Sequence, residues 1–146
     1  MQVRTHDELV AVTAKWLKSH PQNAIIPNCQ TVCNELVTAN CTGETPDVLG
    51  WCCWTSVLIE VKVSRADFLK DKKKPFRQVL SLGLGEFRYY CCPEMLISEA
   101  ELPDNWGLIY CNDKGKLFIV KKAERLEANL IGERTMLLSL IRRENN

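Results

Sequence analysis

An eight-residue run that is mostly apolar and β-branched, yet carries two charges, constrains the fold more than any other feature. Residues 56–63 read SVLIEVKV and predict a buried strand. Successive side chains of a strand point to opposite faces, so Leu58, Glu60 and Lys62 should share one face. Buried charges are rarely left unpaired. The run therefore predicts that a metal ion or an ion pair meets Glu60 and Lys62.

A second acidic residue is expected beside this strand. Pro46 and Asp47 follow a turn-rich segment and precede a short apolar stretch, residues 48–51. That stretch predicts a strand joined to residues 56–63 by a hairpin. Antiparallel pairing of the two strands would bring Asp47 next to Glu60.

Length and composition predict one domain spanning residues 1–146. The chain of 146 residues is 46% hydrophobic and 25% charged, which is typical of a globular domain with its own core. Its start leads into an amphipathic pattern rather than an apolar signal segment, and no apolar run approaches membrane-spanning length. We expect a cytoplasmic protein that does not associate with membranes.

Helical and strand-like segments alternate along the rest of the chain. This order predicts an α/β fold, with a mixed central β-sheet flanked by helices. A strand over residues 30–37 is favoured over one at Ile25 and Ile26, and it would place Glu35 inside the sheet region. The other expected elements are helix 7–19, helix 65–84 interrupted at Pro75, strand 86–92, short helix 94–101, strand 106–111, its hairpin partner 116–120, and a helix from about 123 or later to 143.

Cysteines, aromatic residues and histidines are not expected to form the functional site. The spacing of the cysteines does not suit a zinc site, and reduced thiols in the core are the default. Aromatic residues in the strands of a small domain usually belong to the core, although exposed ones stack on bases. His6 and His20 stand alone at the ends of a predicted helix and receive no role. The cysteines are Cys29, Cys33, Cys41, Cys52, Cys53, Cys91, Cys92 and Cys111, and the strand aromatics are Trp51, Trp54, Tyr89 and Tyr90.

Five basic residues fall within eight positions just after the charged strand: Lys70, Lys72, Lys73, Lys74 and Arg77. Such a run is either a solvated helix face or a phosphate-binding surface. Its position next to Glu60 and Lys62 favours phosphate, and Lys70, Lys73 and Arg77 are the candidates for contact with a nucleic-acid backbone. Ser64 is a further candidate, although its favoured role is to cap the helix together with Asp67.

The pattern Pro46-Asp47…Glu60-Val61-Lys62 resembles the active-site motif of the PD-(D/E)XK nuclease superfamily. The segment from Glu60 to Phe68 and several later positions resemble the MmcB-like DNA-repair group of that superfamily. The later positions are Asp71, Lys73, Pro75, Tyr90, Pro93, Leu102-Pro103 and Gly107-Leu108-Ile109. The resemblance covers roughly residues 30–120. It implies a restriction-endonuclease-like core, in which a helix, strands, a helix and a strand follow in order, and DNA as the partner.

The residue types suit metal-dependent hydrolysis of a phosphodiester. Asp47 and Glu60 are oxygen ligands for Mg²⁺ or Mn²⁺, and the backbone carbonyl of Val61 is a candidate third ligand. Lys62 would orient the attacking water or neutralise the developing oxyanion. The resemblance also implies a further acidic residue from the first helix or strand. Glu35 ranks above Glu8, since a carboxylate such as Glu8 is favourable in a first helical turn.

Three functions remain open at this point. The preferred one is a Mg²⁺-dependent nuclease acting on DNA, with Asp47, Glu60 and Lys62 as its active site. The first alternative is a nucleic-acid-binding module of the same fold without catalysis. The second is a small interaction protein whose last helix forms a homodimer contact through Leu126, Leu130, Leu137 and Ile141.

Overall fold

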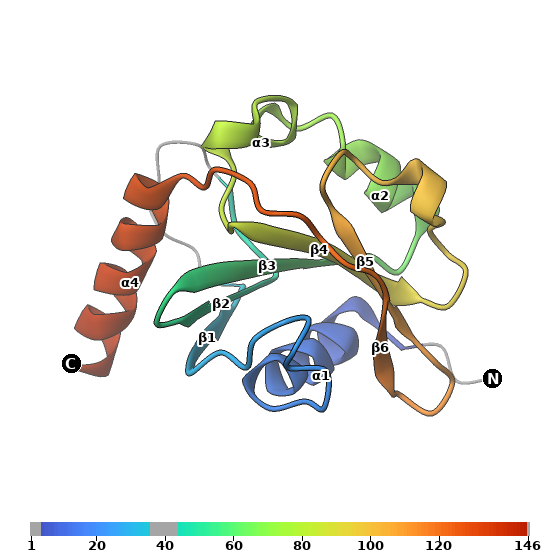
Figure 1. Cartoon of the computed structure of the whole chain (residues 1–146), viewed down its shortest axis with the longest axis horizontal. Helices are drawn as coiled ribbons and strands as arrows, with labels where there is room; N and C mark the ends of the chain where they lie inside the picture. The colour runs from blue at the N-terminus through green and yellow to red at the C-terminus, as the bar shows by residue number, and fades with distance from the viewer. Residues whose placement is uncertain (1–3, 36–43, 146) are drawn as a thin grey trace.

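The protein forms a mixed six-stranded β-sheet with helices on both faces (Figure 1). The computed structural model describes residues 4–35 and 44–145. The α/β class and the mixed sheet flanked by helices are therefore confirmed. In chain order the elements are α1 (His6–Lys18), β1 (Thr31–Asn34), β2 (Val48–Cys52), β3 (Thr55–Val61), α2 (Arg65–Asp71), α3 (Pro75–Gln78), the 3₁₀ helix η1 (Leu80–Leu82), β4 (Phe87–Pro93), the 3₁₀ helix η2 (Glu99–Glu101), β5 (Gly107–Cys111), β6 (Leu117–Lys121) and α4 (Leu130–Glu144).

The strands lie in the sheet in the order in which they occur in the chain, from β1 to β6. The first three are antiparallel, β3, β4 and β5 run parallel, and β6 is antiparallel to β5. A tight turn at Cys53 and Trp54 joins β2 to β3, whereas the parallel step from β3 to β4 passes through α2 and α3, as a parallel connection must. Every residue of β3 is buried, which explains its nearly continuous apolar sequence.

Each face of the sheet has its own hydrophobic core. On one face, α1 places Leu9 and Leu17 in the same cluster as Val57 and Ile59 of β3. On the other face, Phe68 of α2 belongs to the cluster of Leu58, which also includes Met136 of α4. Figure 1 shows α1 on one side of the sheet and α2 with α3 on the other. Because Leu58 lies on the α2 side, Glu60 and Lys62 emerge on that side as well.

Pro75 interrupts the helix expected over residues 65–84, as predicted. Ser64 begins α2 by accepting a hydrogen bond from the Asp67 N–H at 3.2 Å, so its predicted role as the cap is confirmed, without a return hydrogen bond from the Asp67 side chain. Lys74 is extended, with ψ at 146°, and Pro75 is the first residue of α3. The residue before a proline avoids the helical conformation, and proline itself supplies no N–H to an upstream carbonyl. The segment therefore divides into α2, α3 and η1.

One predicted helix is wrong, and the last helix begins late within its expected range. The helix predicted over residues 94–101 is wrong: only η2 forms, because Met95 adopts a positive φ of 69° and helical hydrogen bonding begins at the Ser98 cap. The last helix begins at Leu130, where the Asn129 side chain accepts the Gly132 N–H at 3.0 Å. Residues 122–129 are not helical.

Glu133 connects α4 to the sheet. Its carboxylate accepts hydrogen bonds from Trp51 Nε1 at 3.1 Å, Ser56 Oγ at 3.0 Å and the Gly85 N–H at 2.9 Å. Burial raises the pKa of this carboxyl group, against the effect of those three donors. The buried end of α4 is thus held by polar contacts as well as by Met136.

The side chains expected to form a dimer contact do not share one exposed face. Leu126 is buried in the core, which corrects its assignment to a homodimer contact, and Leu137 is half-buried. Leu130 and Ile141 are exposed. A homodimer stays a prediction.

Within residues 4–35 and 44–145, no helix is both long and apolar enough to cross a bilayer. The cytoplasmic location expected from the sequence stays a prediction.

Candidate functional site

Asp47 lies at the point where the chain enters β2. The register pairs Val48 with Ile59, so that continuing it by one residue places Asp47 opposite Glu60. The Asp47 carboxylate accepts the Val61 N–H through Oδ2 at 2.8 Å, which orients it across the end of β3. The register of the hairpin and this hydrogen bond together explain why Asp47 lies next to Glu60, as the sequence predicted.

Glu60 and Lys62 lie on the same face of the sheet and are both buried. Lys62 Nζ is 3.9 Å from Glu60 Oε2 and 3.5 Å from Asp71 Oδ1. Burial and then the charge of Asp47 raise the pKa of Glu60 well above its ordinary value, against the opposite effect of Arg77. Two carboxylates close together at the end of β3 require compensating positive charge nearby.

Arg77 supplies part of that positive charge, and this corrects its expected role in phosphate binding. Its side chain is only 2% exposed. The guanidinium lies 2.9 Å from Glu44 through Nη1, 3.2 Å from Glu60 through Nη2 and 3.0 Å from Asp71 through Nε. Burial disfavours the charged form, but these carboxylates raise the pKa of Arg77. A guanidinium enclosed in this way does not belong to the exposed basic surface.

Asp71 is a site residue to which the sequence analysis gave no role. Its carboxylate accepts the Tyr90 hydroxyl at 2.6 Å and pairs with Lys62, Lys74 and Arg77. Burial opposes its ionisation, but the charges of Arg77 and Lys62 outweigh burial and lower the pKa of Asp71 to about 2. One sequence signal was available: Asp71 is three residues after the apolar Phe68 on a helix, so both side chains face the core.

Glu35 lies at a different place from the one expected. Strand β1 ends at Asn34, and Glu35 follows it with a positive φ of 50°, its side chain 45% exposed. The Glu35 N–H donates to the Asp47 carbonyl oxygen at 2.9 Å. Glu35 therefore lies at the rim of the sheet beside Asp47 rather than inside it. Glu8 forms a capping box with Thr5 at the start of α1. This agrees with the alternative reading, in which the Glu8 carboxylate stabilises the first turn of the helix.

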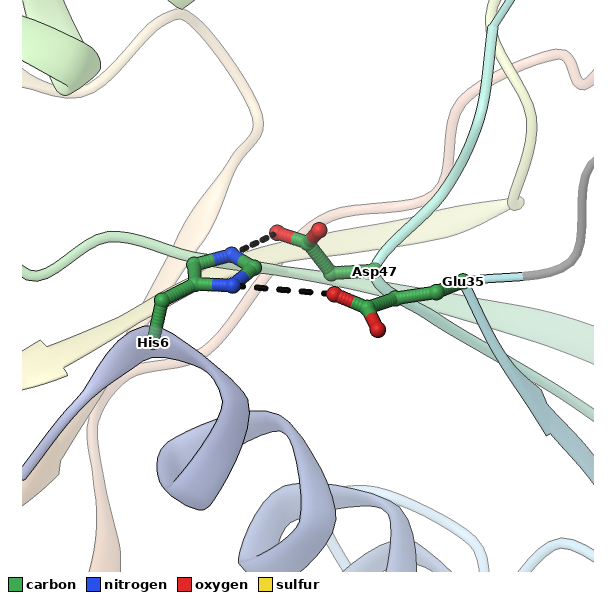
Figure 2. Close-up of side chains that lie close together, drawn as sticks. All are labelled: His6, Glu35 and Asp47. Atoms are coloured by element: carbon green, nitrogen blue, oxygen red, sulfur yellow. Dashed lines mark ion pairs between the residues drawn. The ribbon is translucent and has the colours of Figure 1, made fainter.

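His6 is the second site residue that the sequence analysis missed. Figure 2 shows its ring facing the carboxylates of Asp47 and Glu35, with one ring nitrogen toward each. His6 Nε2 is 3.4 Å from Asp47 Oδ2, and Nδ1 is 3.6 Å from Glu35 Oε1. A lone histidine at a helix start carries no periodic signal, because only the packing of α1 under β1 and β2 brings it to this place. His20, in contrast, is buried and stacks on Trp16.

The five basic residues at positions 70–77 differ in their surroundings: Arg77 is buried, Lys72 and Lys74 contact other residues of the protein, and Lys70 and Lys73 are exposed. Lys72 Nζ donates to the Glu101 carbonyl oxygen at 2.9 Å, and Lys74 pairs with Asp71 at 3.2 Å. Lys70 and Lys73 are exposed. These two are the members of the predicted phosphate-binding set whose side chains remain available at the surface.

We expect Ser64→Ala to lower the free energy of unfolding by about 1 kcal/mol, because the Asp67 N–H loses its cap. The affinity for DNA that the sequence predicts should not change. Urea denaturation and fluorescence anisotropy with labelled DNA would measure the two quantities, with the exposed Ser81→Ala as the control. Weaker DNA binding at unchanged stability would instead make Ser64 a phosphate contact.

Most of the aromatic residues and cysteines considered above are buried, as the sequence predicted. Tyr89 and Tyr90 are buried, Trp51 is half-buried and donates to Glu133, and Trp54 is exposed. The seven cysteines of the described ranges are free thiols, and five are buried: Cys29, Cys33, Cys91, Cys92 and Cys111. Cys41 lies outside the described residues. In the part of the chain that the structure describes, no cysteine joins a group with metal-binding geometry.

Comparison with known proteins supports the fold alone. No family model matches this chain, and no curated protein sequence matches it. A solved structure of a protein of unknown function from Silicibacter pomeroyi is similar, with a TM-score of 0.65 and 22% sequence identity. The match covers 98% of this chain and 90% of the other. The two proteins share the arrangement of helices and strands, and the chemistry of the site has to be inferred from the residues described above.

Proposed function

We propose that this protein is a metal-dependent nuclease that hydrolyses DNA phosphodiester bonds. The observation that carries the proposal is the convergence of two carboxylates and an ammonium group at one end of the buried strand β3: Glu60 lies on β3, Lys62 directly follows it, and Asp47 directly precedes β2. Sites built on such strands hold their side chains more precisely than loops do.

The charge balance of the site fits a divalent cation. Glu60 is buried, and Arg77 Nη2 approaches its Oε1 at 3.2 Å without the geometry of a hydrogen bond. Asp47 adds a second negative charge beside it. Asp47, Glu60 and the Val61 carbonyl would hold Mg²⁺ or Mn²⁺, both of which prefer oxygen ligands. When bound, the cation supplies Lewis-acid stabilisation of the phosphate and a more acidic water.

Lys62 and Asp71 support the reaction from the same face. The Lys62 ammonium is held between Asp71 and Glu60, so it is positioned to donate to a phosphate oxygen next to the two carboxylates. Asp71 stays ionised because of Arg77, Lys62 and the Tyr90 hydroxyl, and it fixes the direction of the Lys62 side chain. Lys70 and Lys73 add exposed positive charge for the DNA backbone.

The proposal includes a restriction-endonuclease-like core. Helix α1, the antiparallel strands β1 to β3, helix α2 and the parallel strand β4 follow in the order that the resemblance implies. This agreement of order supports the proposal, as does the placement of the motif residues, with Asp47 directly before β2, Glu60 and Val61 on β3, and Lys62 directly after it.

Calorimetry with Mn²⁺ and a cleavage assay on single- and double-stranded DNA test the proposal. We expect the wild type to bind Mn²⁺ and to cleave DNA, and EDTA to stop cleavage. The variant Asp47→Asn/Glu60→Gln should lose Mn²⁺ binding and at least about 100-fold in cleavage rate. The exposed pair Glu94→Gln/Asp104→Asn is the charge-matched control. Cleavage that survives EDTA or the site variant would refute the proposal.

A DNA-binding module without catalysis is the second candidate. The observation in its favour is that Lys62 and Arg77 already pair with Glu60. Salt-dependent DNA binding without metal-dependent cleavage would select this function.

A further inference from the structure

Three side chains from separate elements meet beside the proposed active site (Figure 2). His6 is the first residue of α1, Glu35 follows β1, and Asp47 precedes β2. Each offers one metal-binding atom, and these atoms all lie within 4.8 Å of one another. One imidazole and two carboxylates make a mixed nitrogen and oxygen set rather than a purely acidic cluster.

We propose that His6, Glu35 and Asp47 bind a divalent first-row transition metal ion in preference to Mg²⁺. An imidazole nitrogen is a ligand that such ions accept readily, whereas Mg²⁺ demands oxygen ligands and retains water. The site shares Asp47 with the proposed active site, but metal binding there does not require that the protein cleave DNA.

The spacing of one pair of ligand atoms suits direct coordination. Metal–ligand bonds of about 2.1 Å at a tetrahedral angle place two ligand atoms about 3.4 Å apart, and His6 Nε2 lies 3.4 Å from Asp47 Oδ2. The side chains of His6 and Glu35 are 38% and 45% exposed, so an ion and its remaining waters can reach the site. The opposite ring nitrogen faces Glu35 and also Asp7, 3.5 Å away.

The charges around the cluster also favour a cation. Among residues 4–35 and 44–145, no lysine or arginine forms an ion pair with Glu35 or Asp47, and His6 is their common neighbour. Next to Asp47 lies the buried carboxylate of Glu60, whose Oε1 accepts no hydrogen bond in the described structure but lies 3.2 Å from Arg77 Nη2. Glu35 and Asp47, which share one imidazole as a neighbour, are therefore the carboxylates available to a metal ion.

Mn²⁺ is the appropriate probe. Cys52 and Cys53 lie at or near the surface in the β2–β3 hairpin, and thiols of this kind bind Zn²⁺ on their own. Mn²⁺ has little affinity for thiols and is paramagnetic. Calorimetry would measure its affinity against that of Mg²⁺, and pulsed electron paramagnetic resonance would detect coupling to a directly bound imidazole nitrogen.

We expect wild-type protein to bind Mn²⁺ at least about tenfold more tightly than Mg²⁺ and to show the nitrogen coupling. His6→Ala should remove the coupling and the preference, and Glu35→Gln should weaken Mn²⁺ binding by at least about tenfold. Asp7→Asn is the matched control, because Asp7 touches the same ring nitrogen but its side chain is 87% exposed. Its Mn²⁺ affinity should equal that of the wild type.

Three outcomes would overturn the inference: no saturable Mn²⁺ binding, an Mn²⁺ preference that persists in His6→Ala, or equal weakening in Asp7→Asn and Glu35→Gln. The first would mean that His6 and the two carboxylates only contact one another, and the last would mean that nearby negative charge, and not direct coordination by Glu35, strengthens Mn²⁺ binding. Glu60→Gln separates this inference from the proposed nuclease, since it should stop cleavage while the nitrogen coupling persists.

Discussion

Replacing Arg77 with methionine should lower the free energy of unfolding by about 3–5 kcal/mol. The guanidinium is enclosed by Glu44, Glu60 and Asp71, and it lies against the rings of Phe76 and Trp106. Methionine preserves much of the packing but leaves buried carboxylates without their shared cation. Such uncompensated charges cost far more than an exposed ion pair contributes. Urea denaturation at pH 7, followed by circular dichroism, measures the change.

The matched control is Arg65→Met. Arg65 pairs with Glu101, but its side chain is 51% exposed, and exposed ion pairs contribute about 0–1 kcal/mol. A loss of less than about 1 kcal/mol in Arg77→Met would contradict the structural role of Arg77. That result would indicate that Arg77 is exposed in solution and belongs to the basic surface that the sequence predicted.

If the protein is the proposed nuclease, replacing Lys62 with methionine should lower its rate of DNA cleavage by about 10²–10³-fold at saturating DNA. The variant keeps an unbranched side chain of similar length but removes the ammonium group that lies between Asp71 and Glu60. Mn²⁺ affinity should be equal to that of the wild type or higher, because one positive charge next to the carboxylates is lost. Single-turnover cleavage and calorimetry measure the two quantities separately.

Lys114→Met serves as the control, since Lys114 is exposed in the turn between β5 and β6. Its cleavage rate should match that of the wild type. If Lys62→Met cleaves DNA at the wild-type rate, Lys62 is a structural partner of Asp71 and has no part in the reaction. If the rate falls only because Mn²⁺ no longer binds, its role is to organise the metal site.

The sequence was sufficient to predict the central strand and its hairpin. Alternation along residues 56–63 placed Glu60 and Lys62 on one face, and the short stretch before them was correctly expected to pair with it. These features depend on neighbours in the chain and on a two-residue period, so local patterns encode them. The Ser64 cap was predictable for the same reason.

Local patterns alone did not predict which side chains surround those charges. Arg77 and the two lysines at positions 70 and 73 occur in one basic run, yet only Arg77 points inward, where it meets Glu44, 33 residues earlier in the chain. The turn at Pro75 produces that difference, because it redirects the chain between α2 and α3. A charge run in the sequence does not specify which members will be buried.

Sequence therefore determined the strands, the helix cap and the shared face of Glu60 and Lys62, all of which follow from contacts between residues close together in the chain. Tertiary structure alone decided that His6 would meet Glu35 and Asp47, and that Asp71 would hold Lys62. His6 reaches its place because α1 packs against β1, β2 and β3. Periodicity specifies the face on which a side chain lies, whereas its partner across the fold depends on how the elements pack.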